Sequence, residues 1–358
     1  MIGIIYVGNI NRCPYLNKYT DILEENSIDY EVIYWDRASH NKDLKYIEGT
    51  KKNKYHIYSL KSKELRHPAL KIIDFYRFSR FVKYIINEMK YEKLILLTTM
   101  SGIIITSELK NKYKNKYIFD YRDASFEYFR PFKRKLGEII ENSYFTCISS
   151  EGFLEILPQS HKYIMTHNIP NNPKVMQYKQ TFNDKIAIGY IGGIRESKYM
   201  KKLIDLFKGD NRFEFVIHGG GENLEELIEY AKESINIIFT GPYVETEKAH
   251  LIKNLDLICY NYPESYVNNY ATANKFYDSL IYKKPLIGNI KTYSGMLIQK
   301  SGVGVSLDFD DVEYKNKIFS YYNSLNFMDF ESNCNSVLDK IEKDNKLYMD
   351  KIEDFISE

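Results

Sequence analysis

The stretch that decides the fold is IAIGYIGGIRESK, residues 186–198. Its first six residues predict a buried strand, and Gly192 and Gly193 predict a tight turn directly after it. A helix is expected next, and because free amides at a helix N-terminus attract anions, the segment predicts a diphosphate site. Arg195 and Lys198 would add positive charge there. A tight turn with two surface cations would leave the same pattern, and the dinucleotide fingerprint G-x-G-x-x-G is absent.

The same alternation of strand and helix extends over most of the chain. Short β-branched or aromatic runs are separated by segments long enough for helices, which predicts parallel sheets. These runs are residues 2–7, 30–35, 93–98, 116–121, 143–149 and 162–167, and then 185–191, 212–218, 235–240, 255–260, 285–289 and 303–307. Between 168 and 184 the pattern lapses into Asn, Pro and other polar residues, which predicts a linker.

Length and this break together predict two domains. The chain has 358 residues, more than the roughly 250–300 at which a single core stops growing. We expect an α/β protein with two Rossmann-like, doubly wound domains facing each other across a cleft, and ligands at the carboxyl ends of the strands. The predicted parts are a first domain over 1–170, a linker over 171–184, a second domain over 185–325 and a helical tail over 326–358 that packs across both domains.

Composition excludes several classes of protein. The chain carries 50 Lys and Arg against 48 Asp and Glu, so a uniformly basic surface for nucleic acid is not expected. An aromatic content of 15% excludes a disordered chain. The longest apolar stretch, 94–106, is too short to span a membrane, and the first strand lacks the features of a signal peptide. Four scattered cysteines suggest neither a disulfide framework nor a zinc site, so a cytoplasmic location is expected.

Two more segments of the second half suit a phosphorylated ligand. The cluster HGGGE at 218–222 follows a predicted strand, so its backbone could approach a ligand closely, although such glycines often form an ordinary loop. Further on, Asn274, Lys275 and Asp278 fall within one turn of a predicted helix. Lys275 could neutralise a phosphate while Asp278 accepts hydrogen bonds from ribose hydroxyls; a surface Lys–Asp pair is the alternative.

These segments, together with FTGP at 239–242 and KPLI at 284–287, resemble the family-4 glycosyltransferases of bacterial cell-surface polysaccharide synthesis. The first half is similar more loosely, through residues 117–123, 147–151 and 167–170. The resemblance implies the GT-B fold and a retaining transfer of sugar from a nucleotide diphosphate donor. It also implies that the C-terminal domain holds the nucleotide and that neither a metal nor another cofactor is required.

The resemblance also implies roles for matching residues. The residues expected to bind the donor are Gly192, Gly193, Gly220, Gly221, Pro242, Tyr243, Glu264, Tyr270, Asn274 and Asp278. Tyr270 stands where many members of the family carry a glutamate, and Glu264 could supply a carboxylate from the preceding loop. The residues expected to be catalytic are Arg195, Lys198 and Lys275, and also Asp120, which is chosen for its position at the end of a predicted strand. A diphosphate is a good leaving group, so we expect hydrogen-bond donors at the phosphates to dominate catalysis.

The first half is expected to bind the acceptor. Asp120, Arg122 and Asp123 end a predicted strand, where a carboxylate could orient an acceptor hydroxyl. A carboxylate–guanidinium network that closes the strand is the alternative. The turn after the first strand would reach the same region through Asn9, Asn11 and Arg12.

Two stretches combine cations with aromatic residues. Cations beside aromatics suit an anionic membrane surface or a lipid diphosphate acceptor, although a solvated helix face would read the same. The cations concerned are Arg77, Arg80, Lys83, Arg130, Lys133, Arg134 and Lys135.

The sequence thus predicts a metal-independent hexosyl- or N-acetylhexosaminyltransferase that uses a UDP-sugar and a glycan or lipid-linked acceptor, peripheral to the inner face of the membrane. Uridine is favoured because it is common in such enzymes. Two alternatives stay open. One is a nucleotide-sugar 2-epimerase of the same fold. The other is a donor-binding partner subunit without transfer activity, suggested by Tyr270.

Overall fold

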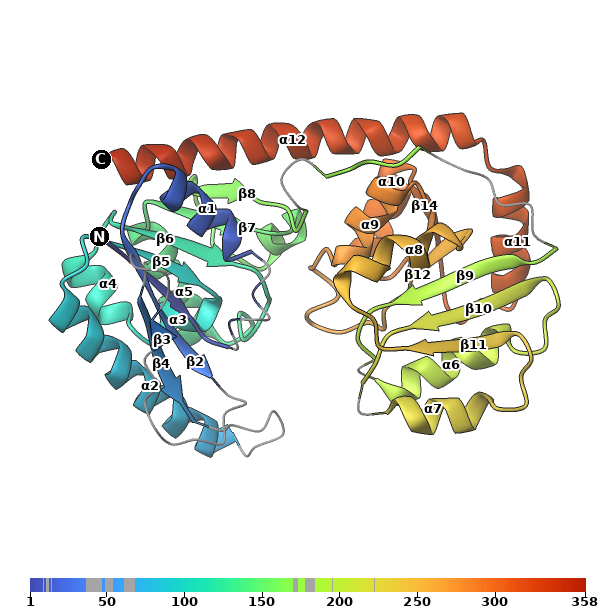
Figure 1. Cartoon of the computed structure of the whole chain (residues 1–358), viewed down its shortest axis with the longest axis horizontal. Helices are drawn as coiled ribbons and strands as arrows, with labels where there is room; N and C mark the ends of the chain where they lie inside the picture. Colours follow the sequence, from blue (N-terminus) through green and yellow to red (C-terminus); the bar gives the residue numbers. More distant parts are fainter. Residues whose placement is uncertain are drawn as a thin grey trace. The chain divides into compact units, whose positions relative to one another are not determined.

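The computed structural model describes residues 1–8, 10, 13, 15–36, 47–48, 54–60, 68–169, 173–177, 184–194, 196–221 and 223–358. The chain forms two compact units, coloured by sequence in Figure 1. Unit 1 comprises Met1–Asn168 and Lys343–Glu358, and unit 2 comprises Ile169–Glu342. The last helix, α12 (Phe327–Ser357), belongs to unit 2 up to Glu342 and to unit 1 from Lys343 onwards.

Unit 1 contains an eight-stranded sheet in the order β3-β4-β2-β1-β5-β6-β7-β8. Its paired strands are parallel except for β3 and β4. The strands are β1 (Ile2–Tyr6), β2 (Tyr30–Asp36), β3 (Ile47–Glu48), β4 (Lys54–Ser59), β5 (Lys93–Leu97), β6 (Tyr117–Tyr121), β7 (Phe145–Ile148) and β8 (Tyr163–Met165).

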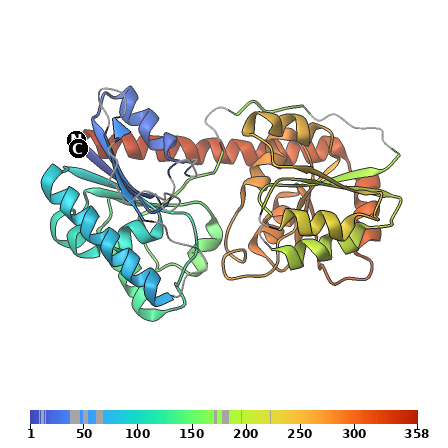
Figure 2. The ribbon, with the colours of Figure 1, turned by 60° about the horizontal axis from the view of Figure 1, so that its bottom comes forward.

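Helices cover both faces of this sheet (Figures 1 and 2). On one face, Tyr19 of α1 (Asn17–Glu25) packs edge to face against Tyr348 of α12, with ring centroids 5.8 Å apart. On the other face, Trp35 of β2 packs against Phe78, with centroids 5.6 Å apart. Besides α1 and α12, the helices of unit 1 are α2 (Pro68–Met89), α3 (Thr99–Ile103), α4 (Thr106–Lys112), α5 (Arg130–Asn142) and the 3-10 helix η2 (Glu151–Glu155).

Unit 2 contains a six-stranded, fully parallel sheet in the order β11-β10-β9-β12-β13-β14. One face packs on α6, α7 and α11, and the other on α8, α9, α10 and α12. Its elements are β9 (Ile186–Ile191), α6 (Ser197–Phe207), β10 (Phe213–His218), α7 (Leu224–Ala231), β11 (Ile237–Gly241), η3 (Glu245–Glu247), α8 (Lys248–Lys253), β12 (Leu257–Tyr260), α9 (Asn274–Tyr282), β13 (Leu286–Asn289), α10 (Tyr293–Ser301), β14 (Gly304–Leu307) and α11 (Tyr314–Ser324).

The predicted α/β architecture is confirmed, and every run predicted as a strand contains one. The sequence missed β3 and β4. In β4 only Ile57 is buried, and the strand reads KYHIYS, so it lacks the apolar signal on which the prediction depended. No helix in the described ranges is long and apolar enough to cross a membrane.

The order of strands in unit 2 points to a place for a ligand. From β9 the chain extends the sheet first through β10 and β11, and later through β12 on the opposite side of β9. Because the strands are parallel, their carboxyl ends lie at one edge, and ligands of such sheets bind where the order reverses. In unit 2 this switch point lies between the carboxyl ends of β9 and β12.

Candidate functional site

Backbone hydrogen bonds join the three loops that follow β9, β10 and β11. The amide of Gly192 donates to the carbonyl of His218, and the amide of Ile194 donates to that of Gly220, both at 2.9 Å. The amide of Gly219 donates to the carbonyl of Gly241, also at 2.9 Å. The loops therefore form one connected backbone surface at the carboxyl edge of the sheet.

Some glycines of these loops are needed for close packing of the backbone, and others face open space. A Cβ on Gly219 would lie 1.9 Å from the carbonyl oxygen of Gly192, and one on Gly221 would lie 2.1 Å from that of Ile194, so both are needed for loop packing. A Cβ on Gly192 or Gly193 would meet no described atom within 4 Å. The space in front of the β9 turn is therefore open to a ligand.

Gly220 and Pro242 are also in contact, because a Cβ on Gly220 would lie 2.9 Å from the Pro242 ring. Pro242 is exposed, and the half-buried Tyr243 packs against the core that holds α8 and α9. The structure thus brings together the glycine turns and Pro242 and Tyr243, which the resemblance implies bind the donor. Gly220 and Gly221 shape this surface by packing against protein atoms.

Lys275 lies at the switch point and is only 5% exposed. Its ammonium lies 4.1 Å from the ring centre of Tyr190, in β9, and 4.6 Å from that of Tyr262, which follows β12. Nζ also donates to the Tyr262 hydroxyl at 2.7 Å. Among the described residues no carboxylate oxygen lies within 4 Å of Nζ, so the ammonium forms no direct ion pair there, although its charge acts on Asp278 one turn away.

Asp278, one turn further along α9, has a protein partner that the sequence did not suggest. Its Oδ1 lies 2.7 Å from Nζ of Lys248, the first residue of α8. Burial raises the pKa of Asp278, and the Lys248 ammonium opposes that shift. Lys248 lies 30 positions from Asp278 in a charged segment, ETEKAH, so no sequence spacing links them.

The remaining predicted donor residues lie on the same edge. Asn274 is the first residue of α9 and is exposed, and Glu264 is exposed in the loop after β12. In that loop the Tyr270 ring packs edge to face against Tyr266, with centroids 5.6 Å apart. Lys198 is exposed in the first turn of α6. Arg195 lies outside the described residues.

His218 is a further buried group at this edge. Its Nδ1 lies 2.8 Å from the hydroxyl of Thr240, and Nε2 has no hydrogen-bond partner in the part of the chain that the structure describes. Burial lowers the pKa of His218, so the imidazole is neutral at pH 7. In the sequence, the only feature that marked His218 as a residue of this edge was its position directly before the three glycines.

In unit 1, Asp120 and Arg122 form a buried network. Arg122 donates from Nε to Oδ1 of Asp120 at 2.5 Å and from a terminal nitrogen to Oδ2 at 2.8 Å. The Tyr19 hydroxyl also donates to Oδ2, at 2.7 Å, and Asp120 is 0% exposed. These contacts favour the structural alternative for both residues, because no face of the Asp120 carboxylate reaches solvent.

Arg122 is held on other sides too. Its other terminal nitrogen donates to Asn168 at 2.6 Å, and its guanidinium lies 4.4 Å from the ring centre of Tyr15. Asp123, the next residue, is exposed. The other predicted acceptor residues, Asn9, Asn11 and Arg12, lie outside the described residues.

The cations of the two basic stretches differ in their surroundings. Lys83 pairs with Glu108 at 3.2 Å, so its charge is balanced. Lys133 is half-buried. The exposed cations are Arg77, Arg80, Arg130, Arg134 and Lys135.

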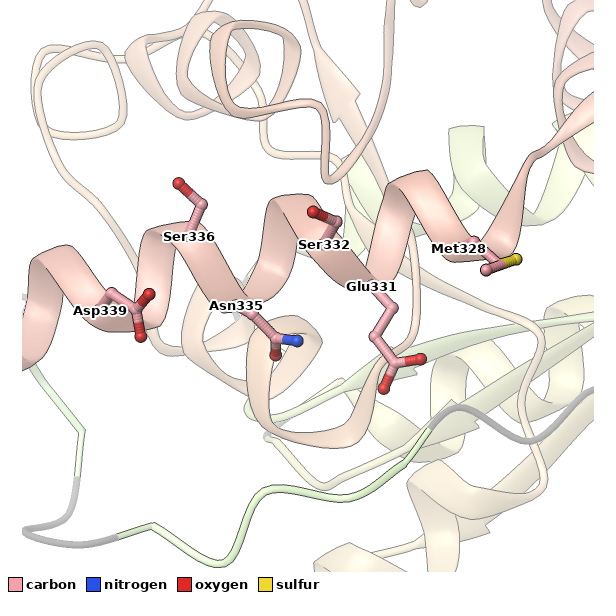
Figure 3. Close-up of a pocket in the computed structure, with 6 residues that line it drawn as sticks. All are labelled: Met328, Glu331, Ser332, Asn335, Ser336 and Asp339. Carbon is pink, nitrogen blue, oxygen red and sulfur yellow. The ribbon is translucent and has the colours of Figure 1, made fainter.

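A hollow of about 470 Å³ lies elsewhere in unit 2, along α12 (Figure 3). Its lining residues come from this one helix: Met328, Glu331, Ser332, Asn335, Ser336 and Asp339. Glu331 and Asp339 are its charged groups, so it would repel a diphosphate, and none of the predicted donor residues lines it. Across the described ranges, no group of three or more His, Cys, Asp or Glu side chains is arranged to hold a metal ion.

The sequence matches no family model, and no curated protein matches it. Solved structures do match. The lipopolysaccharide outer core galactosyltransferase WaaB is 14% identical with a TM-score of 0.63, over 99% of both chains. HepE from Anabaena in complex with UDP is 12% identical with a TM-score of 0.65, over 99% of this chain and 100% of HepE.

A third match is an E. coli trehalose-6-phosphate structure bound with UDP-2-fluoro glucose. It is 8% identical with a TM-score of 0.69, over 99% of this chain and 98% of that one. The likeness runs over nearly the whole length of each chain. This protein therefore has the GT-B fold of glycosyltransferases.

Proposed function

We propose that this protein is a retaining glycosyltransferase that moves a hexosyl or N-acetylhexosaminyl group from a UDP-sugar to a glycan or lipid-linked acceptor in bacterial surface polysaccharide synthesis. The observation that carries the proposal is the Lys275 ammonium, buried at the switch point of unit 2 with no carboxylate within 4 Å among the described residues. A buried charge without a partner is costly, and a bound diphosphate would supply the missing negative charge.

The surroundings of Lys275 support a phosphorylated ligand. The open turn at Gly192–Gly193 lies at the end of β9, and Lys275 contacts Tyr190 of the same strand. Lys198 and the N-terminus of α6 follow that turn, so backbone amides and a second ammonium are available to the same ligand. Two of the matching structures contain UDP or a UDP-sugar analogue, which supports uridine as the base.

The transfer reaction breaks the bond between the anomeric carbon of the sugar and a phosphate oxygen. Negative charge grows on the departing diphosphate, where Lys275, Lys198 and the amides of the β9 turn would stabilise it. The diphosphate leaves without protonation by an acid, so a second carboxylate of the kind that hydrolases use is not required. In a retaining transfer the acceptor oxygen bonds to the same face of the sugar, and its proton passes to the donor's phosphate.

The acceptor is proposed to bind at the carboxyl edge of the sheet in unit 1. Asp123 is exposed there and could orient a hydroxyl. Asn9, Asn11 and Arg12, which follow β1 in the sequence and lie outside the described residues, are proposed to contribute to the same acceptor site. Asp120 is left out of this role, because its carboxylate is enclosed by Arg122 and Tyr19.

The proposal is tested by titrating the protein with nucleotides and then offering it sugar donors. In calorimetry with EDTA present, UDP is expected to bind more tightly than uridine, because the diphosphate supplies the charge that pairs with Lys275. A panel of UDP-sugars with lipid extracts should then release UDP and label an acceptor. Equal binding of uridine and UDP would remove the diphosphate site. Conversion of a UDP-sugar without acceptor would indicate the epimerase.

We propose that the protein binds the membrane surface, where a lipid-linked acceptor would be located. Exposed apolar side chains accompany the exposed cations: Ile72 and Tyr76 in α2, and Phe126, Tyr128 and Phe129 just before α5. Apolar groups beside cations bind anionic lipid surfaces, at about 1 kcal/mol for each cation near the surface.

We therefore expect the protein to bind phosphatidylglycerol vesicles and not phosphatidylcholine vesicles in a sedimentation assay. Replacing Arg130 and Arg134 together with glutamine should weaken binding by about 2 kcal/mol, or roughly thirtyfold. Replacing the exposed Lys202 and Lys300 of unit 2 with glutamine is the matched control, with little expected change. Equal losses for both double variants would show that general charge, and not this surface, attracts the lipid.

A further inference from the structure

The ion pair between Lys248 and Asp278 joins two neighbouring helices of unit 2, α8 and α9 (Figure 1). The Lys248 side chain is 13% exposed and that of Asp278 is 9% exposed. A pair so far withdrawn from water has a defined geometry, unlike a mobile pair on the surface. It lies one helical turn from the unpaired ammonium of Lys275.

The two oxygens of the Asp278 carboxylate differ in their surroundings. Oδ1 is held by Lys248 at 2.7 Å. No hydrogen bond to Oδ2 is formed among the described residues, and the Lys275 ammonium donates to the Tyr262 hydroxyl instead. Oδ2 therefore keeps its capacity to accept hydrogen bonds from a ligand.

Several groups face Asp278 and influence its charge. Burial raises the pKa of Asp278; Lys248 of α8 and Lys275 of α9 oppose this shift, while Glu245 of η3 adds to it. Tyr243 and Tyr282 face the same carboxylate and carry no charge at neutral pH. Without Lys248, burial and Glu245 would be opposed by Lys275 alone, so Asp278 would take up a proton more readily.

We propose that Lys248 is a positioning residue for donor binding, which anchors Oδ1 of Asp278 so that Oδ2 accepts hydrogen bonds from the ribose hydroxyls of a nucleotide diphosphate. The inference rests on the function proposed for this edge of unit 2. It adds a residue that touches no substrate and acts through the orientation and charge of another. A purely structural ion pair would stabilise the fold without affecting how nucleotide binding depends on pH.

The test compares Lys248→Met with the wild type in calorimetric titrations between pH 5.5 and 8.5. The probe is UDP or GDP, whichever the wild type binds more tightly. We expect roughly tenfold weaker binding at pH 7, the effect of losing a hydrogen bond to a charged group. The ratio of the two Kd values cancels titration of the ligand, and it should rise as the pH falls because Asp278 becomes protonated in the variant.

The control is Lys253→Met, on the exposed side of the same helix, for which the ratio should stay near one at every pH. A second comparison removes the partner. In an Asp278→Asn background, Lys248→Met should cause no further loss and no dependence of the ratio on pH. This double variant has neither buried charge, so it gives an answer even where Lys248→Met alone does not fold.

The possible results distinguish failure of the role proposed for Lys248 from failure of the proposed glycosyltransferase function. Nucleotide binding by the wild type with an unchanged Kd in Lys248→Met overturns the inference and leaves the proposed function standing. A loss that is the same at every pH, or that persists in the Asp278→Asn background, also overturns it. Failure of the wild type to bind either nucleotide overturns both.

Discussion

Replacing Lys275 with methionine is expected to abolish sugar transfer and to weaken nucleotide binding by about 3 kcal/mol, or more than a hundredfold. The ammonium is buried between the rings of Tyr190 and Tyr262 with no carboxylate within 4 Å in the described residues. A diphosphate would form its missing ion pair, so removal of the charge removes a large share of the binding energy. Calorimetry with UDP and a transfer assay measure the two effects.

The same substitution should raise the stability of the protein without ligand. The wild-type protein carries the cost of a buried, unpaired charge, whereas methionine keeps the contact with both aromatic rings and has no charge to desolvate. A higher melting temperature combined with lost binding is therefore the expected result. Lys202→Met, at an exposed position of α6, should change neither property. Transfer at the wild-type rate by Lys275→Met would remove the proposed phosphate site.

Replacing Asp120 with alanine is expected to destabilise unit 1 by about 3–5 kcal/mol, the usual cost of removing one partner from a buried ion pair. Arg122 is itself 5% exposed and would lose both of its bonds to the carboxylate. The change should lower the urea midpoint of the transition that belongs to unit 1, followed by fluorescence of the single tryptophan, Trp35.

Two further variants separate structure from catalysis at this position. Asp123→Ala removes the neighbouring exposed carboxylate and should change stability by less than about 0.5 kcal/mol. Asp120→Ala combined with Arg122→Met removes both charges and should recover part of the lost stability. An Asp120→Ala protein with the wild-type urea midpoint but no transfer activity would restore the catalytic role that the sequence predicted.

Features set by neighbouring residues could be predicted from the sequence, whereas contacts between distant segments could not. The strands other than β3 and β4 were predictable because buried parallel strands are runs of apolar residues, such as IAIGYI in β9. β4 was not, because its sequence KYHIYS places polar residues on both faces and buries only Ile57. Lys275 could be singled out because it shares one helical turn with Asp278, a spacing that the sequence displays. Lys248 could not, because α8 and α9 meet only after the chain has folded.

The role of the Asp120–Arg122 pair also could not be predicted from the sequence. The spacing of the two residues allowed either a ligand site or an internal network. Their burial distinguishes these alternatives, and burial depends on residues that are distant in the sequence.

The alternation of apolar runs with helical segments was sufficient to determine an α/β protein with glycine turns after β9 and β10, because strand burial and turn geometry are imposed by neighbouring residues. Tertiary structure alone decided which charges are neutralised: Asp120 is enclosed by Arg122 and Tyr19, Asp278 is paired with Lys248, and Lys275 has no carboxylate partner within the described chain. The physical reason is that the cost of a buried charge depends on groups brought close by the fold, whatever their separation along the chain.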